Sequence, residues 1–480
     1  MQAAMANFGL ETVAAEIFLL GAVCVVLLVD VFLSDRNRWI TYALSLLSLA
    51  GAAYVTLRFS VDSRIFGLDG MVVADPMGDV LKLFTYGAVA VAFVYAREYL
   101  QRRDLFKGEI FILGLMALLG VMVMISAGSL LTVYLGLELM SLSLYSMVAF
   151  DRESGVSAES AMKYFVLGAI ASGTMLYGFS IVYGLTGTLQ LHELAVAVGE
   201  IGAGNVGLTF ALAFIMVGVA FKFGAAPFHM WIPDVYHGAP TPVTLFISSA
   251  PKIGSFVLAI RVLAEGLEAM VASWQDMLIA LSVLSMIVGN VVAIAQRNLK
   301  RMLAYSTISH VGFILLGVLA GTSAGYRAAM FYTLTYVIMA VGSFGMILLL
   351  ARQGFEADRI EDFRGLNRKS PWFAAVMLML MFSTAGAPPF LGFWAKLAVL
   401  GAVLDVGLAW LAAVAVLLSV VGAFYYLRVV KVMYFDEPAD QVAIDAGGTL
   451  RTVLSANGLA VLALGVFPSV LMDLCARVLP

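Results

Sequence analysis

The stretch ALAFIMVGVAFKFGAAPFHMWIPDVYHGAPTPVTLFISSAPKIGSF, residues 211–256, decides the fold class. It contains two apolar runs typical of membrane helices, and each run carries a lysine, Lys222 or Lys252, close to proline or glycine. Proline removes a backbone hydrogen bond, and inside a membrane the freed carbonyl must be satisfied by protein or by water in a cavity. The stretch therefore predicts a membrane protein with hydrated helix breaks beside buried charge.

The composition of the whole chain fits the same class. Of its 480 residues, 62% are hydrophobic and only 12% are charged, whereas a soluble protein is about half apolar and about a quarter charged. These values exclude a soluble enzyme, a disordered chain and a nucleic-acid-binding protein, and a net charge of -3 leaves no basic patch for phosphates. Two cysteines exclude a disulfide scaffold and any site built from several cysteines, and four histidines without close spacing argue against a His-rich metal site.

Apolar runs of membrane-spanning length recur along the chain. A spanning helix needs roughly 20 apolar residues, and on that measure the sequence predicts an all-α polytopic membrane protein with about fourteen transmembrane helices. No large soluble segment separates them, so we expect residues 1–480 to form a single integral membrane domain. The expected spans are 12–33, 39–59, 73–95, 109–127, 129–150, 161–184, 207–228, 240–264, 275–295, 302–320, 327–350, 371–397, 403–430 and 453–474.

The basic residues are unevenly divided among the loops. Most of the 28 lysines and arginines fall in loops such as 35–38, 97–107, 297–301 and 352–369, whereas the intervening loops contain few. Basic loops stay on the cytoplasmic side of a membrane, so both termini are expected on the periplasmic side of a bacterial inner membrane. The opening sequence MQAAMANFGL lacks the basic region and cleavage site of a signal peptide, so the first span is expected to stay in the membrane.

Several ionisable residues interrupt the apolar runs. A charge near the bilayer centre costs about 2.5 to 3.5 kcal/mol, so such residues face the protein interior and mark an ion or proton path. Lysine suits a proton path because burial lowers its pKa until it can release a proton, which arginine cannot do. These residues are Lys82, Lys163, Lys222, Lys252, Lys396, Glu138 and His310.

Each of these charges also has a structural interpretation, as a fixed ion pair or as a side chain that reaches the membrane surface. Lys82 fits a fixed pair best, because Asp79 lies one helical turn away. The deeper lysines have no carboxylate at that spacing, which favours a functional role. We expect Glu138 to pair with Lys163 or Lys222, because a pair that forms and breaks would control the proton affinity of both groups.

A short motif next to the first break recurs later in the chain. Gly-Ala-Ala-Pro-Phe at 224–228 matches Gly-Ala-Pro-Pro-Phe at 386–390, and an odd number of expected spans separates the two copies. Interrupted spans in corresponding positions of an inverted repeat point to a transport site. We therefore expect a first repeat over 109–264 and a second, inverted repeat over 275–430. His229 follows the first copy and suits a relay, since an imidazole both accepts and donates a proton.

Motifs for other chemistries are missing from the sequence or lack the required context. Residues 202–207 match GxGxxG, but they lead into a membrane span and follow no strand, so we reject nucleotide binding. The sequence contains no Walker A, HExxH or CxxC motif and no visible redox centre.

Four segments carry a family resemblance. They are YLGLELMSLSLY (134–145), KFGAAPFHMWIPDVYHGAPTPV (222–243), KRMLAYSTISHVGF (300–313) and GAPPFLGFWAK (386–396). They resemble the antiporter-like, proton-pumping membrane subunits of respiratory complex I, and the likeness covers almost the whole chain. Lys396 makes the resemblance closest to the subunit N branch, because subunits M and L typically have glutamate in this span. Subunits of multisubunit sodium/proton antiporters and of membrane hydrogenases are the alternatives.

The resemblance implies the number of spans given above, an inverted five-helix repeat, two broken helices and roles for individual residues. It implies that Glu138 and Lys222 form a modulating acid–base pair and that Lys163 lies beside them. It also implies that Lys252 is the central relay and that His229 leads to it. Quinone reduction elsewhere in the complex would drive protons through this chain.

The remaining implications concern the exit of the proton and the partners. Lys396 would be the terminal donor, and His310 would bridge toward it. FMN, iron-sulfur clusters and quinone are expected in other subunits, with no cofactor in this chain. The expected partners are a subunit M-like chain, the small membrane subunits, lipids, water and protons, and no nucleic acid.

Overall fold

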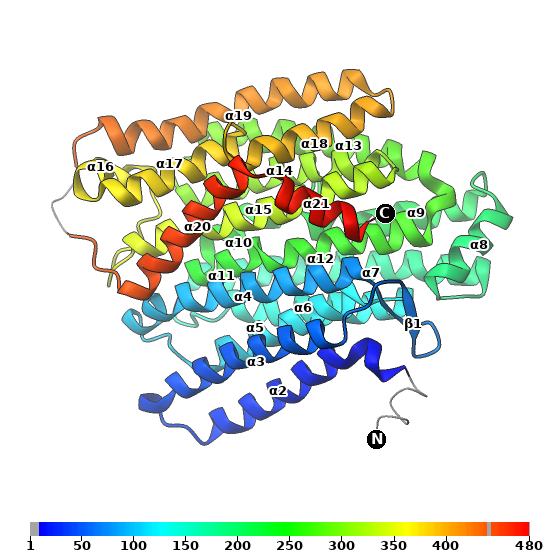
Figure 1. Cartoon of the computed structure of the whole chain (residues 1–480), viewed down its shortest axis with the longest axis horizontal. Helices are drawn as coiled ribbons and strands as arrows, with labels where there is room; N and C mark the ends of the chain where they lie inside the picture. The colour runs from blue at the N-terminus through cyan, green and yellow to red at the C-terminus, as the bar shows by residue number, and fades with distance from the viewer. Residues whose placement is uncertain (1–8, 439–442, 480) are drawn as a thin grey trace.

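The protein is a bundle of long helices that lie side by side, as Figure 1 shows. This computed structural model describes residues 9–438 and 443–479. Within them, 13 helices are long and apolar enough to cross a membrane. The strands of the described part form one small antiparallel hairpin, β1 (Ile65–Gly67) with β2 (Val72–Ala74). The prediction of an all-α polytopic membrane protein is confirmed.

The chain begins with three helices and continues into the first predicted repeat. The opening helices are α2 (Ala14–Val31), α3 (Trp39–Arg58) and α4 (Pro76–Arg102). The next elements are α5 (Gly108–Ile125), α6 (Leu130–Val148), α7 (Gly155–Thr186), α8 (Leu191–Ile201), α9 (Val206–Phe223), α10 (Trp231–Gly238), α11 (Thr241–Ser248) and α12 (Ala250–Ala259). A π-helical turn, Ile260–Gly266, extends α12.

The second predicted repeat and a C-terminal pair of helices complete the bundle. The elements are α13 (Val271–Ala295), α14 (Leu299–Leu319), α15 (Ser323–Leu350), α16 (Leu366–Lys369), α17 (Pro371–Ala385), α18 (Leu391–Asp405), α19 (Ala409–Phe435), α20 (Gly448–Val466) and α21 (Ser469–Val478). In Figure 1, α2 and α3 lie at one margin of the bundle and α19 lies at the other.

One predicted span differs from the others in form. The span expected at 371–397 consists of the two short helices α17 and α18, neither of which is long enough to span a membrane alone, so the long apolar helices of the described residues number 13. The seventh expected span, 207–228, is interrupted as well, because α9 ends at Phe223 and the next helix, α10, begins only at Trp231. The prediction of two broken helices is therefore confirmed. A third interruption lies at Ser249, between α11 and α12, where the backbone leaves the helical region.

The two predicted breaks share one backbone geometry. Gly224 and Gly386 end α9 and α17 in the left-handed conformation, with φ of 76° and 87°. In both breaks the amide N–H groups of the glycine and of the next residue donate to carbonyls in the last turn of the preceding helix. Glycine adopts this conformation without the steric cost that a side chain imposes, which explains its presence in both motifs.

The connections around the bundle also repeat. An isolated bridge joins Ser129, just before α6, to Gln190, just after α7. A second isolated bridge, in the corresponding place of the second half, joins Asn298, just before α14, to Arg359, which follows α15. This shared pattern supports the predicted internal repeat, whose boundaries remain a prediction.

In each predicted repeat the first two helices, α5 with α6 and α13 with α14, pack closely in the same way. A Cβ atom added to Gly120 of α5 would lie 2.4 Å from the amide nitrogen of Met140 on α6. One added to Gly289 of α13 would lie 2.5 Å from the amide nitrogen of Ser309 on α14. In both halves a glycine therefore allows the two backbones to approach closely, as small residues do in membrane helices.

Three elements form the centre of the bundle. The most apolar windows of Thr241–Gly266, Leu299–Leu319 and Ser323–Leu350 are 100%, 94% and 89% buried, whereas those of the outer helices are far more exposed. Two of these central elements carry predicted site residues, Lys252 and His310. The candidate path therefore runs through the part of the bundle that is best shielded from lipid.

Candidate ion path

The side chain of Lys252, on α12, reaches the end of α9, where the first broken helix is interrupted. Its side chain is buried on α12, and its Nζ donates a hydrogen bond of 2.8 Å to the carbonyl oxygen of Phe223, the last residue of α9. The ring of Trp231 lies 5.6 Å from Nζ. Carbonyl groups at the end of a helix carry partial negative charge. The break therefore provides a counter-charge for a lysine that has no carboxylate near it in sequence.

Lys396 has the same arrangement at the second break. Its Nζ donates to the carbonyl oxygen of Ala385, the last residue of α17, and to Ser419 Oγ on α19, both at 2.8 Å. The ring of Phe313 lies 5.0 Å from Nζ. Each of the two predicted breaks is thus capped by a buried lysine, Lys252 from α12 at the first break and Lys396 from α18, the second half of the same span, at the second. The sequence predicted both lysines and both breaks, but not that they would touch.

Lys222 and Glu138 are brought near one another without direct contact. Lys222 Nζ donates to Ser141 Oγ on α6 at 2.7 Å, and Glu138 lies one turn before that serine. The charge of Glu138 acts on Lys222, but within the described residues no ion pair joins them. Glu138 Oε1 is buried without a hydrogen-bond partner there. The predicted pair is placed close together, with Ser141 holding the lysine.

Lys163 lies in a different group of charges. Its side chain is 44% exposed, and its Nζ lies 2.7 Å from Glu159 and 2.9 Å from Asp234. Asp234 on α10 also pairs with Arg301 on α14, at 2.9 Å. Lys163 therefore joins α7 to α10 and α14, and it is not paired with Glu138.

His229 lies in the break between α9 and α10, as predicted. Its side chain is half-buried, and its Nδ1 is buried without a hydrogen-bond partner in the described chain. No hydrogen bond of the described residues links it to Lys222 or Lys252. Its predicted relay role stays a prediction.

His310 is the centre of a hydrogen-bonded cluster on α14. Its Nδ1 lies 2.8 Å from the hydroxyl of Tyr332, and its Nε2 lies 3.1 Å from the hydroxyl of Tyr426. Tyr426 in turn lies 2.5 Å from Ser306 Oγ. Phe313, which covers Lys396, stacks on Tyr332 with an interplanar angle of 4°. Within the described residues no hydrogen bond joins His310 to Lys396, and the predicted bridging role of the histidine stays a prediction.

The two tyrosines of this cluster were missed by sequence reasoning. Tyr332 and Tyr426 lie in apolar helices, where a tyrosine is more often a packing residue than part of a path. Their hydroxyls can be recognised only when α14, α15 and α19 are placed together. No local pattern in the sequence marks them.

The partner predicted for Lys82 is wrong. Lys82 Nζ lies 2.7 Å from Glu16 on α2, and Ser126 also donates to that carboxylate. Asp79 instead accepts from the amide of Val61. The structural interpretation of Lys82 is supported, but spacing along one helix could not reveal a partner on another.

Two basic residues expected in loops are buried. Arg261 is fully buried in the π-helical turn, and its guanidinium lies 2.7 Å from Asp75 and 2.8 Å from Glu265. Lys300 is also buried, at the start of α14. Both lie near the ends of predicted spans, where boundaries read from sequence are uncertain by several residues.

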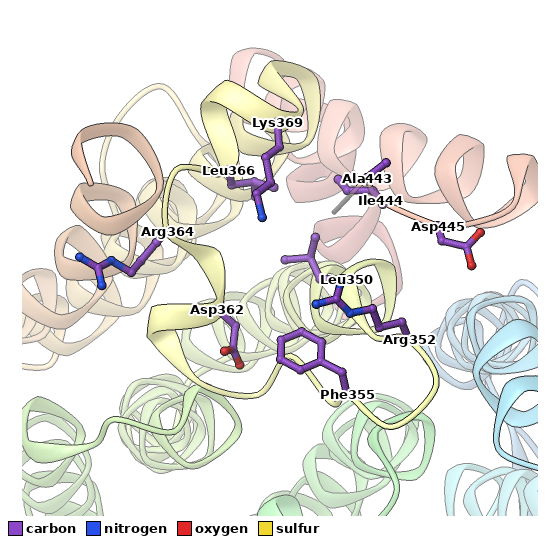
Figure 2. A pocket seen from close by; sticks show the side chains of 10 residues that line it. All are labelled: Leu350, Arg352, Phe355, Asp362, Arg364, Leu366, Lys369, Ala443, Ile444 and Asp445. Atoms are coloured by element: carbon purple, nitrogen blue, oxygen red, sulfur yellow. The ribbon is translucent and has the colours of Figure 1, made fainter. Parts of the chain in front are cut away.

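A pocket of about 150 Å³ opens among the loops that follow α15 and α19 (Figure 2). Arg352, Arg364 and Lys369 line it together with Asp362 and Asp445. Burial raises the pKa of Asp362. None of the predicted site residues lines this pocket, so it is separate from the chain of buried lysines. Within 9–438 and 443–479, no group of three or more His, Cys, Asp or Glu could hold a metal ion.

The fold and the buried lysines define a class of protein, the multi-pass membrane subunits that move ions through broken helices. The sequence profile described as NADH:quinone oxidoreductase/Mrp antiporter, TM matches residues 127–422. The chain belongs to this family.

Relatives and solved structures agree with this assignment. The chain is 58% identical, over 96% of each sequence, to NADH-quinone oxidoreductase subunit N of Thiobacillus denitrificans. It is similar to a chain of respiratory complex I from Thermus thermophilus, with a TM-score of 0.82 and 30% identity over 96% of this chain and 98% of that one. It is also similar to a chain of an archaeal membrane-bound sulfane sulfur reductase, with a TM-score of 0.86 and 26% identity over 97% and 96% of the two chains.

Proposed function

We propose that this chain is the proton-translocating subunit N of a bacterial NADH:quinone oxidoreductase. The observation that carries the proposal is that Lys252 and Lys396 each bind the last carbonyl group of a broken helix. The strong identity to curated relatives with that name selects this complex from the wider family. The chain works beside other membrane subunits of the complex, and FMN, iron-sulfur clusters and quinone are held elsewhere.

The route of the proton runs along the buried polar residues. Lys222, held by Ser141 and influenced by Glu138, adjusts the charge felt by Lys252. The proton then passes through the His310 cluster to Lys396. A lysine bound to helix-end carbonyls is stabilised in its charged form, so a change of charge nearby is needed for release.

The energies involved are adequate for pumping. Moving one proton against 100 mV costs about 2.3 kcal/mol. A change of two units in the pKa of a lysine corresponds to about 2.7 kcal/mol. Making and breaking one ion pair near a buried lysine therefore covers this cost.

The orientation in the membrane follows from the basic loops. The loops at 103–107, 296–298 and 351–365 lie at one end of the bundle, where contacts such as the bridge between Asn298 and Arg359 join them. The positive-inside rule places this basic-loop end in the cytoplasm and both termini in the periplasm.

The test begins with the complex itself. An affinity-tagged chain, purified in mild detergent, is expected to bring down an enzyme that reduces quinone with NADH. In proteoliposomes that enzyme should acidify the lumen with no requirement for sodium. Lys222→Ala should lower proton translocation and quinone reduction together without loss of assembly, whereas the exposed Lys431→Ala should change neither.

The alternative is a subunit of a sodium/proton antiporter, since the family includes both kinds of protein. That function predicts a preparation without NADH activity whose proton movement follows an imposed sodium gradient. This result, or normal pumping by a fully assembled Lys222→Ala complex, would contradict the proposal.

A further inference from the structure

A compact polar cluster lies at the basic-loop end, away from the lysines discussed so far. Its centre is Glu356, in the segment after α15, with both carboxylate oxygens 2.9 Å from the hydroxyl of Tyr99. Glu356 also accepts a hydrogen bond from Thr241 at the start of α11, and it lies 2.5 Å from Arg103. The fifth member is Lys300, whose Nζ lies 3.9 Å from Glu356. We call these five residues the inner cluster.

The inner cluster contains both a residue that solvent can reach and a buried one. The side chain of Glu356 is 25% exposed, whereas that of Lys300 is only 3% exposed. Lys300 donates a hydrogen bond of 2.8 Å to the carbonyl oxygen of Ala239, which follows the last residue of α10. Lys300 is therefore bound at a helix end, as Lys252 and Lys396 are. It is a third lysine of this kind, but with a carboxylate beside it that solvent can reach.

Polar side chains of α14 lie further into the protein than Lys300, and we call Ser306 and Thr307, with their tyrosine partners, the polar lane. Thr307 lies seven residues further on, which is about 10 Å along the same face of the helix. Its hydroxyl lies 2.8 Å from the hydroxyl of Tyr336. The neighbouring Ser306 lies 2.5 Å from Tyr426, which reaches His310. These hydroxyls lie between the inner cluster and the His310 cluster on a route that includes neither Lys222 nor Lys252, and within the described residues no hydrogen bond spans the step from Lys300 to Thr307.

One buried hydroxyl lies near Thr307, at the inner end of the step from Lys300. Tyr236 on α10 is fully buried, and its hydroxyl has no hydrogen-bond partner in the described part of the chain. It is close enough to Tyr336 for the two hydroxyl groups to interact electrostatically. A buried polar group without a protein partner is satisfied by an ordered water in most structures. Such a water would bridge the step that no protein contact spans.

We propose that Glu356 and Lys300 form a proton-loading gate that supplies the His310 cluster from the basic-loop side. After charged Lys300 has given its own proton inward, Glu356 takes a proton from the aqueous phase, and that proton then leaves the carboxyl oxygen and joins the free lone pair of Lys300 Nζ. Lys300 passes it inward to water beside Tyr236 and so regains a free lone pair. Arg103 keeps its charge throughout, because arginine does not deprotonate in proteins. The gate rests on the proposed function, since it loads the same pump.

The first test is Glu356→Gln in the complete enzyme, reconstituted in proteoliposomes. Glutamine preserves the shape and one of the two acceptor oxygens but cannot carry the proton. Proton translocation is expected to fall about ten-fold or more, since positioned acid–base groups contribute factors of about 10² to 10⁴. The matched control is Glu361→Gln, an exposed carboxylate in the same loop region, which should pump normally.

Rescue separates a proton carrier from a structural acceptor. Formate added on the basic-loop side should restore pumping to Glu356→Gln, because a small weak acid can replace the missing carboxyl at a partly exposed site. Normal pumping by the assembled variant would overturn the gate. A loss that formate does not restore, matched by an equal loss in Thr241→Val, would also overturn it by showing a structural role.

Lys300→Arg provides a second, independent measurement. Arginine keeps the charge and can still bind the carbonyl of Ala239, but it cannot release a proton. The gate predicts an assembled enzyme that pumps about ten-fold more slowly, as for the carboxylate variant. Full pumping by Lys300→Arg would overturn it. If Lys222→Ala abolishes pumping while both inner-cluster variants pump normally, the gate fails and the proposed function stands. If the wild type moves no protons, the proposed function itself fails.

Discussion

A buried lysine beside a helix-end carbonyl is the unit from which this path is built. Lys252 binds Phe223 and Lys396 binds Ala385, each through one hydrogen bond of 2.8 Å. The carbonyl supplies partial negative charge without becoming a proton acceptor itself. The lysine is therefore stabilised when charged but remains free to give its proton to a neighbouring group. A carboxylate in the same place would compete for the proton.

The hydroxyl of Tyr426 is expected to be part of the path, because it connects Ser306 with His310. Tyr426→Phe removes only that oxygen, so proton translocation should fall by about ten-fold while assembly is retained. The comparison variant is Tyr425→Phe, because Tyr425 packs against Tyr426 but donates its hydroxyl to Asn290 and, in the described residues, makes no hydrogen bond to His310. Proton pumping is measured with a pH-sensitive dye in proteoliposomes. Equal rates for the two variants would exclude Tyr426 from the path.

At the scale of elements, the breaks bring helix ends into the middle of the bundle. Intact helices would satisfy all their carbonyls internally and leave none for the lysines. Gly224 and Gly386 make this possible by ending α9 and α17 in the left-handed conformation. The breaks therefore determine where a lysine can be bound.

Gly386→Ala should damage the second break. Its φ of 87° is strained for alanine, at a cost of about 1 to 2 kcal/mol. The new methyl group would also lie 2.7 Å from Cδ of Lys396. We expect a lower melting temperature of the purified complex together with slower proton translocation. Gly401→Ala, on α18 with open space around it, should leave both unchanged. Equal behaviour of the two variants would show that the backbone at Gly386 tolerates a side chain.

Sequence patterns predicted the breaks and most of the lysines for a simple physical reason. A lysine in an apolar run is costly enough to indicate a specific role, and a motif that combines glycine with proline marks an interrupted span. The partners of the lysines could not be predicted in the same way. Every residue has a carbonyl group, so nothing distinguishes Phe223 or Ala385 in the sequence. Glu16, the partner of Lys82, lies on another helix and is equally invisible to local spacing.

At the scale of the whole molecule, a buried ion pair joins the central helix to the N-terminal part. Arg261 binds Asp75, which precedes α4, and donates to the carbonyl oxygen of Ile125 at the end of α5. Arg261 lies in the π-helical turn that directly continues α12, the helix that carries Lys252. The network therefore fixes the far end of that helix against two neighbours.

Arg261→Ala is expected to destabilise the protein. Removing one partner leaves the buried carboxylate of Asp75 without its main counter-charge, which costs about 3 to 5 kcal/mol. The melting temperature and detergent resistance of the complex should fall, and less of the chain should assemble. Arg477→Ala, at an exposed position on α21, is the control and should be neutral. A variant at position 261 as stable as wild type would show that the pair adds no net stability.

The central claim is that buried lysines at helix breaks carry the translocated protons, and Lys396→Arg tests it most directly. Arginine retains the positive charge and the capacity to bind Ala385, but it does not release its proton. The measurement is the number of protons moved per NADH oxidised by the assembled complex in proteoliposomes. We expect a stable complex in which that number or the coupled turnover falls strongly. A fully assembled Lys396→Arg enzyme with wild-type turnover and wild-type proton yield would contradict it.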